Sequence, residues 1–327
     1  MDEDNIYAAL RRGAAQTDRS ALARIVLGGA DRRVLLQGLL TNDVGALGPG
    51  SGCYAAWLTP QGRMIADLVV LELTDRALLL VPAPRRDAVI AHIEASIFSE
   101  DVTLEDEAGL YEHLGLDGPR STEMIERVLA GGQAARVPLY ATAAATFRGA
   151  TVLAARTDWL GIPGYDLFVE VPAAAALSDA LTAAGAPVAD PAVAEIVRIE
   201  SGRPRFGPDM DEHTIPLEAG IEDRAISFTK GCYVGQEVIV RVLHRGGGRV
   251  ARKLVGLILD RDAPPGTPLV ANDRETGRLT SVGRSPALGR VIALGYVGRD
   301  LAEPGTRLDL SGGGSAVVTK LPFVQAS

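Results

Sequence analysis

The chain has 327 residues, of which 47% are hydrophobic and 23% charged, and its formal net charge is −8. This length suffices for two or three domains, and the hydrophobic content excludes wholesale disorder. An acidic chain is a poor general binder of nucleic acid or anionic membranes, because its electrostatic field repels phosphate. Its apolar runs are short, and its acidic first residues lead into no apolar run, so we expect a cytoplasmic protein without a membrane span.

The first part of the chain alternates helical and strand patterns. Apolar residues at helical spacing, ended by polar clusters, predict helices, whereas short apolar runs around a polar turn predict a hairpin. On this basis we predict a helix over 31–40, a hairpin of runs 69–73 and 77–81, and a helix after Pro84 that places Val89, Ile90, Ile93 and Ile97 on one face.

A second α/β stretch follows Pro119. We predict a helix capped by Ser121 and ended by the glycines 131–132, a strand over 165–171 and a helix over 173–184. Asp190 and Pro191 then supply a capping side chain and a first-turn proline for a helix over 192–201, which carries Arg198 and Glu200.

The pattern changes near the three glycines 246–248. Short runs at 254–259, 290–296, 306–310 and 316–321, separated by turn residues, predict an antiparallel barrel of about 80 residues. The glycines 312–314 are predicted to form one of its hairpin turns. We therefore divide the chain into residues 1–246 and a barrel domain over 247–327.

Common catalytic and metal motifs are absent. The sequence has no GxGxxG after a strand, no Walker A loop, no GxSxG and no HExxH, and its four histidines do not pair at metal-ligand spacing. Cys53 and Cys232 form no CxxC pair, which excludes a zinc ribbon or a disulfide framework. We expect no metal site made by this chain alone.

Residues 230–237 read KGCYVGQE and form the first candidate site. Gly231 and Gly235 allow close backbone approach, and Lys230 lies where its charge would favour the reactive thiolate of Cys232. The same pattern also fits a small buried cysteine in a tight turn. A single thiol cannot hold a cluster, although it can supply one ligand to a cluster shared with a partner.

The second candidate is the basic run over 241–253, which contains Arg241, His244, Arg245, Arg249, Arg252 and Lys253. It is consistent with a dock for a polyanion, either a γ-glutamyl tail or RNA, and equally with a solvated linker. The third is a pair of carboxylates in strand-like contexts, Asp67 and Asp166. A fixed carboxylate can accept the adjacent N–H donors of a pterin, although each aspartate alone also fits a surface position.

Several motifs resemble the glycine-cleavage T-protein (aminomethyltransferase) superfamily. These are residues 39–44 (LLTNDV), 62–68 (GRMIADL), 198–202 (RIESG), 207–216 (GPDMDEHTIP) and the late segments 293–297, 304–305 and 320–324. KGCYVGQE further resembles the YgfZ-type branch of folate-binding proteins and its mitochondrial iron–sulfur assembly relatives. True T-proteins lack this cysteine loop.

The resemblance implies an α+β cloverleaf of three domains, two α/β folate-binding subdomains and a C-terminal antiparallel β-barrel, with tetrahydrofolate in a central opening. It implies that Asp67 lies near the reactive nitrogens of the folate and that Asp166 holds the pterin. Tyr54 and Trp57 are candidates to flank the aminobenzoyl ring, or they are core aromatics. Where T-proteins have a second acidic residue before Asp67, this chain has Ala66, which disfavours glycine-cleavage chemistry.

The resulting hypothesis is a folate-dependent accessory protein for [4Fe–4S] enzymes, including enzymes that modify tRNA, acting with an A-type iron–sulfur carrier. Cys232 would meet the redox or cluster chemistry close to the folate, within the signature loop of Lys230, Gly231, Tyr233, Gly235, Gln236 and Glu237. Arg241 and Arg245 would receive anions. Two alternatives stay open: an aminomethyltransferase that uses lipoyl-bound aminomethyl groups, and a module that binds tRNA through residues 241–253, which the acidic charge disfavours.

Overall fold

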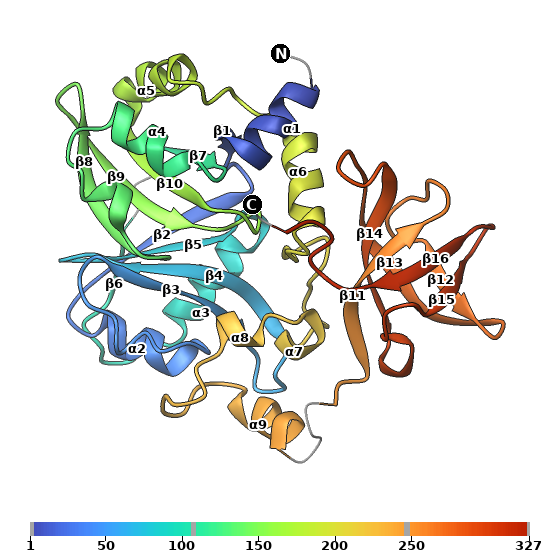
Figure 1. Cartoon of the computed structure of the whole chain (residues 1–327). Helices are drawn as coiled ribbons and strands as arrows, with labels where there is room; N and C mark the ends of the chain where they lie inside the picture. The colour runs from blue at the N-terminus through green and yellow to red at the C-terminus, as the bar shows by residue number, and fades with distance from the viewer. Residues whose placement is uncertain (1–2, 106–108, 245–248, 326–327) are drawn as a thin grey trace.

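The computed structural model describes residues 3–105, 109–244 and 249–325. Its larger part contains two five-stranded antiparallel sheets that lie one above the other in Figure 1. The first sheet has the order β3 (Ser51–Leu58), β4 (Met64–Glu72), β5 (Ala77–Pro82), β2 (Leu22–Gly28) and β6 (Thr103–Glu105). The second has the order β1 (Ala15–Asp18), β7 (Tyr111–Asp117), β10 (Gly164–Glu170), β9 (Ala150–Thr157) and β8 (Thr142–Phe147).

Helices cover the outer face of each sheet (Figure 1). The first sheet carries α2 (Arg32–Leu39) and α3 (Arg86–Glu94), which follows the short helix η1 (Ala83–Arg85). The second carries α4 (Ser121–Val128), η2 (Ala134–Arg136) and α5 (Val171–Ala183). Each helix buries an apolar stripe on its sheet, for example Leu36 and Ile93 on the first and Ile125 and Leu177 on the second. Such burial is the main source of stability for short helices.

The inner faces of the two sheets share one core. Tyr54, Met64 and Val69 of the first sheet lie in the same apolar cluster as Phe168 of the second. The chain after the second sheet completes this cluster through α7 (Pro216–Ala219), α8 (Glu222–Ala225) and α9 (Gln236–His244). The two sheets are therefore held together by segments distant in sequence.

A closed six-stranded barrel forms the third lobe. Its strands are ordered β11 (Arg252–Leu259), β14 (Arg290–Gly298), β13 (Arg274–Ser285), β12 (Pro268–Ala271), β15 (Arg307–Leu310) and β16 (Ser315–Thr319). The barrel packs on α6 (Pro191–Glu200), where Ile199 meets Ile292 and Leu294. The N-terminal helix α1 (Glu3–Arg12) packs against α6 as well, and α6 also contacts β1, so α6 lies between the second sheet and the barrel (Figure 1).

Most predicted elements are confirmed. The hairpin pairs Glu72 with Ala77, and Asp190 caps α6 by accepting the backbone N–H of Ala192 at 2.8 Å. The predicted cap of α4 is wrong, because Ser121 is the first helical residue and its buried hydroxyl makes no capping bond. Helix α9 was not predicted, since its basic residues were interpreted as part of a linker or anion dock. The predicted boundary between residues 246 and 247 lies outside the described residues.

Candidate functional site

A central cavity of about 480 Å³ opens where the two sheets, α6 and the chain after α6 meet. Its walls come from the β1–β2 connection, the β3–β4 pair, the start of η1 and the loop 203–208 that follows α6. The side chains used below are among those that line it: Arg19, Tyr54, Asp67, Trp159, Arg198, Arg203, Arg205, Phe206 and Arg224.

Asp67 faces this cavity together with Tyr54. The β3–β4 register pairs Ala56 with Asp67 and Tyr54 with Val69, so all four residues share one face of the sheet. Tyr54 donates its hydroxyl hydrogen to Asp67 Oδ2 at 2.8 Å, and Asp67 is 6% exposed. Burial raises the pKa of Asp67, and burial together with the nearby carboxylate raises the pKa of Tyr54 well above its usual value. The site thus offers a desolvated carboxyl group whose charged form is disfavoured by burial.

Two arginines extend this wall. The guanidinium of Arg224 stacks on the ring of Tyr54 with 4.5 Å to its centroid. Arg224 also donates to Asp158 at 3.4 Å, and Arg203 forms an ion pair with the same carboxylate. Asp158 accepts a further bond from Tyr140 at 2.9 Å. A largely apolar cavity with cations at one side suits a heterocycle that carries an anionic substituent.

Asp166, which is predicted to hold the pterin, is not among the residues that line the cavity. It is fully buried: Arg19 Nε donates to its Oδ1 at 2.6 Å and Trp159 Nε1 donates to its Oδ2 at 2.8 Å. Burial alone would raise the pKa of Asp166, but the nearby Arg19 and His113 lower it. The Nε2 atom of His113 lies 3.2 Å from Asp166 Oδ1. Asp166 therefore orients Arg19 and Trp159, which themselves face the cavity.

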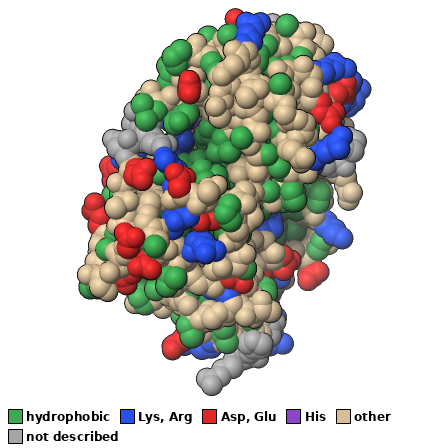
Figure 2. Space-filling view, turned by 90° about the vertical axis from the view of Figure 1, so that its left-hand side faces the viewer, with side chains coloured by type: hydrophobic (Ala, Val, Ile, Leu, Met, Phe, Trp, Pro, Cys, Tyr) green, Lys and Arg blue, Asp and Glu red, His purple; other side chains and the backbone are tan. Residues whose placement is uncertain are grey.

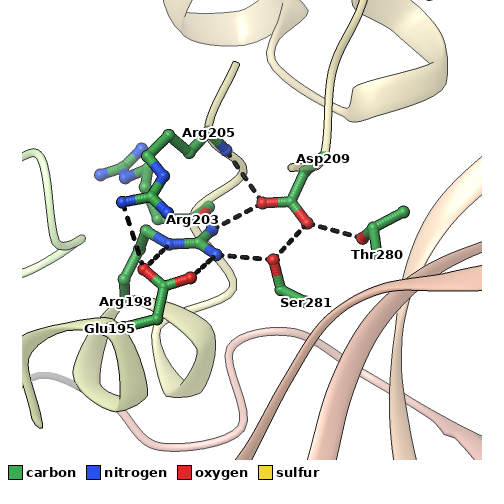
Figure 3. A network of polar contacts seen from close by, with 7 residues as sticks. All are labelled: Glu195, Arg198, Arg203, Arg205, Asp209, Thr280 and Ser281. Atoms are coloured by element: carbon green, nitrogen blue, oxygen red, sulfur yellow. Dashed lines mark hydrogen bonds and ion pairs between the residues drawn. The ribbon is translucent and has the colours of Figure 1, made fainter. Parts of the chain in front are cut away.

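Arg198 and Glu200 point in different directions from the end of α6, as two residues separated by two positions on a helix must. Arg198 lies between Glu195, Asp209 and Ser281 (Figure 3). Glu200 instead accepts bonds from Tyr7, Arg11 and Ser285. Through these contacts the barrel strand β13 braces α6 and the loop that borders the cavity.

Of the two predicted places for Trp57, beside the aminobenzoyl ring or in the core, the structure has it in the core. Side chains alternate along a strand, and Trp57 therefore lies on the opposite face of β3 from Tyr54. It is 2% exposed among residues under α2 and α3, with its ring edge against His92.

The KGCYVGQE loop packs on α2 and the β3–β4 hairpin, and none of its residues lines the central cavity. Cys232, which is predicted to lie close to the folate, is therefore not part of the cavity wall. Lys230 donates to the carbonyl oxygens of Gln37, Leu40 and Asn42 at 2.6, 2.6 and 3.0 Å, so it caps the end of α2 rather than serving the thiol.

The backbone of the loop is held closely. Gly235 has a φ of +85°, and a Cβ there would lie 2.6 Å from the carbonyl oxygen of Thr59. Tyr233 is buried, Gln236 and Glu237 begin α9, and Gly231 is exposed. Cys232 is exposed too, so the interpretation as a small buried cysteine is wrong. The loop presents a thiol to the surface from a fixed backbone.

Arg241 is exposed on α9 and is not part of the cavity wall, while Arg245 lies outside the described residues. Figure 2 shows acidic and basic side chains interspersed on one face, with hydrophobic side chains gathered in a hollow across its middle. Among the described residues there is no group of three side chains that could hold a metal ion, and none of the helices there is long and apolar enough to cross a membrane.

Two family models match the chain. The GCVT N-terminal domain matches residues 4–230, and the glycine cleavage T-protein C-terminal barrel domain matches residues 252–325. The chain belongs to the GcvT family. Its predicted fold, an α+β T-protein cloverleaf with a C-terminal antiparallel barrel, is confirmed.

Relatives in the GcvT family carry the name aminomethyltransferase. One from Rubrobacter xylanophilus is 32% identical over 293 residues, which cover 89% of this chain and 78% of the relative. One from Streptomyces avermitilis is 30% identical and covers 98% of this chain and 89% of its own. The crystal structure of the glycine cleavage system aminomethyltransferase T from Bartonella henselae has a TM-score of 0.86 at 22% identity, over 98% of this chain and 89% of that one, which shows the shared fold.

Sequence reasoning missed Arg19, Trp159, Arg203 and Arg224 as cavity residues. Their positions depend on non-local packing: Arg19 reaches Asp166 across 147 positions, and Arg224 meets Tyr54 from another segment. The only local hint was the pair of arginines in residues 202–206, GRPRF, directly after the predicted end of α6.

Proposed function

We propose that this protein binds tetrahydrofolate in the central cavity. The observation that supports this most directly is the buried Asp67 hydrogen-bonded to Tyr54 on the cavity wall. Members of the GcvT family generally bind tetrahydrofolate. In this proposal Asp67 accepts N–H groups of the reduced pterin, Tyr54 fixes the orientation of the carboxyl group, and Trp159 and Phe206 contribute apolar surface.

We further propose that the folate-loaded protein supports iron–sulfur enzymes, including those that modify tRNA, with an A-type carrier as partner. Cys232 is exposed on a loop that does not line the cavity, an arrangement that suits contact with another protein rather than chemistry on the folate. The loop from residue 231 onward lies between the two segments that the family models match. Ala66 also removes the second acidic residue expected of a glycine-cleavage enzyme.

The second candidate function is aminomethyl transfer to tetrahydrofolate. The names of the relatives favour it, since several share about 30% identity over nearly the whole chain. It requires that Asp67 act on the folate amine and that the thiol of Cys232 be dispensable.

The deciding experiment compares the wild-type protein with Asp67→Asn and Cys232→Ser. Calorimetric titration with tetrahydrofolate should show binding by wild type and Cys232→Ser, and binding by Asp67→Asn weaker by about 10- to 100-fold. Ammonia release from aminomethyl-lipoyl carrier protein, unaffected by Cys232→Ser, would favour the transferase. Absence of that release, with loss of iron–sulfur enzyme activity in cells that carry Cys232→Ser, would favour the accessory role. Wild-type protein that does not bind tetrahydrofolate would contradict both.

A further inference from the structure

Arg198 lines the central cavity but has no donor left for a ligand. Its Nε and Nη2 bond the two oxygens of Glu195 at 2.9 and 2.6 Å. Nη2 also bonds Ser281 at 2.7 Å, while Nη1 bonds Asp209 at 2.7 Å and the carbonyl oxygen of Arg203. A guanidinium has five N–H groups, and these five bonds use all of them. Arg198 is therefore a positioning residue for the cavity wall (Figure 3).

Arg203, unlike Arg198, has N–H groups without a hydrogen-bond partner among the residues that the structure describes. Its Nη2 donates to Asp158, but its Nε is buried without a hydrogen-bond partner, and within the described residues its Nη1 has none either. The side chain is 18% exposed and lines the cavity. Nη1 is thus a charged donor that the protein leaves free at the edge of the ligand space, where a ligand acceptor would be held by a charge-assisted bond.

The charge around Arg203 is not balanced. Among the described residues, Asp158 is the one carboxylate that pairs with Arg203 and Arg224, so two guanidinium groups share it. Asp67 on the same wall offsets this poorly, because burial raises its pKa. An unpaired cation in a partly desolvated site is unfavourable, and a ligand carboxylate would neutralise it. The planar guanidinium of arginine matches a carboxylate in shape.

We propose that Arg203 binds a carboxylate of the glutamate part of reduced folate and determines specificity for ligands that carry it. This inference rests on the proposed folate site. Arg203 and Asp67 would then hold the two ends of one ligand. The wall between them is formed by Tyr54, Arg224 and Asp158. Arg278 is the control, because its side chain is 66% exposed on β13, pairs with Glu275 at 3.3 Å and does not line the cavity.

The test compares the dissociation constants of tetrahydrofolate and tetrahydropteroate, which lacks the glutamate, by calorimetry. Wild type should bind tetrahydrofolate about 10- to 100-fold more tightly, the range expected for a hydrogen bond to a charged group. Arg203→Gln should remove this preference while leaving tetrahydropteroate binding unchanged, and Arg203→Lys should restore part of it. The control Arg278→Gln should retain it in full.

Equal affinity of wild type for the two compounds, or an undiminished preference in Arg203→Gln, would overturn the inference while leaving folate binding intact. Failure of wild type to bind either compound would overturn the folate site and this inference with it. Circular dichroism verifies the fold of each variant. If Arg203→Gln does not fold, the wild-type preference and its change in Arg203→Lys decide the question.

Discussion

Lys230 donates its ammonium hydrogen to the carbonyl oxygen of Leu40 at 2.6 Å, which ties the cysteine loop to the C-terminal end of α2. Bonds to Gln37 and Asn42 complete this cap. The end of a helix carries unsatisfied carbonyl groups and partial negative charge, so a lysine there is stabilising. The first residue of the loop is thus structural, while its cysteine remains accessible.

Replacing Lys230 by Met should lower the free energy of unfolding by about 1–3 kcal/mol, because the hydrogen bonds to three carbonyl oxygens are lost. Burial lowers the pKa of Lys230 to about 8, whereas the lysine in the unfolded chain titrates near its usual value of about 10.4. Between these values the unfolded state binds more protons, so the wild-type protein gains stability as pH rises. The cost of Lys230→Met should therefore grow from about pH 7 to about pH 10.

Urea denaturation at the two pH values measures this cost. The exposed Lys320 provides the control, since Lys320→Met should change stability by less than about 0.5 kcal/mol at either pH. A cost of Lys230→Met that shrinks with rising pH would contradict the assigned titration.

The two cysteines should differ in reactivity by at least about 100-fold, because only the thiolate is nucleophilic. Cys232 is exposed, whereas burial raises the pKa of Cys53 to about 12. Iodoacetamide at about pH 8 should alkylate Cys232 first in the folded protein, and Cys53 only after denaturation. Peptide mass spectrometry measures the two rates. Cys232→Ser should leave the folded protein unlabelled, and rapid labelling of Cys53 in that variant would refute the prediction.

Local signals explain which parts of this fold were predictable. Asp190 and Pro191 mark the start of α6 by side-chain chemistry alone, and alternation places Tyr54 and Trp57 on opposite faces of β3. The threading of the sheets was not predictable, because β1 pairs with β7 about 100 residues away. The residues of the cavity were the least predictable. Resemblance to the family identifies Asp67, but Arg203 reaches the same wall only through tertiary packing.

Asp209 should be essential for stability. It is 2% exposed and accepts bonds from Arg198, Thr280 and Ser281, so it joins the cavity loop to the barrel (Figure 3). Removing one partner of a buried ion pair costs about 3–5 kcal/mol, and Asp209→Ala should lower the free energy of unfolding by that amount. Chemical denaturation checks this. The exposed pair of Asp262 and Arg284 is the control, where Asp262→Ala should cost less than about 1 kcal/mol.

Asp67 should reduce stability at neutral pH as the cost of its role in binding. Burial raises the pKa of Asp67 above that of an unfolded aspartate, about 3.9, so the folded state binds more protons above that pH. Stability then falls as pH rises through the interval between the two pKa values. Asp67→Asn keeps an oxygen that can accept the hydroxyl hydrogen of Tyr54 but cannot ionise. We expect this variant to be more stable than wild type near pH 7 and equal to it near pH 4.

Urea denaturation at both pH values, with Asp179→Asn on the exposed face of α5 as control, tests this expectation. The control should track wild type at each pH, because Asp179 is exposed and a surface substitution changes stability little. An Asp67→Asn variant less stable than wild type near pH 7 would mean that the ionised carboxylate is favoured in the folded protein. A gain in stability with a loss of tetrahydrofolate binding would instead mark Asp67 as a group retained for its ligand at the expense of the fold.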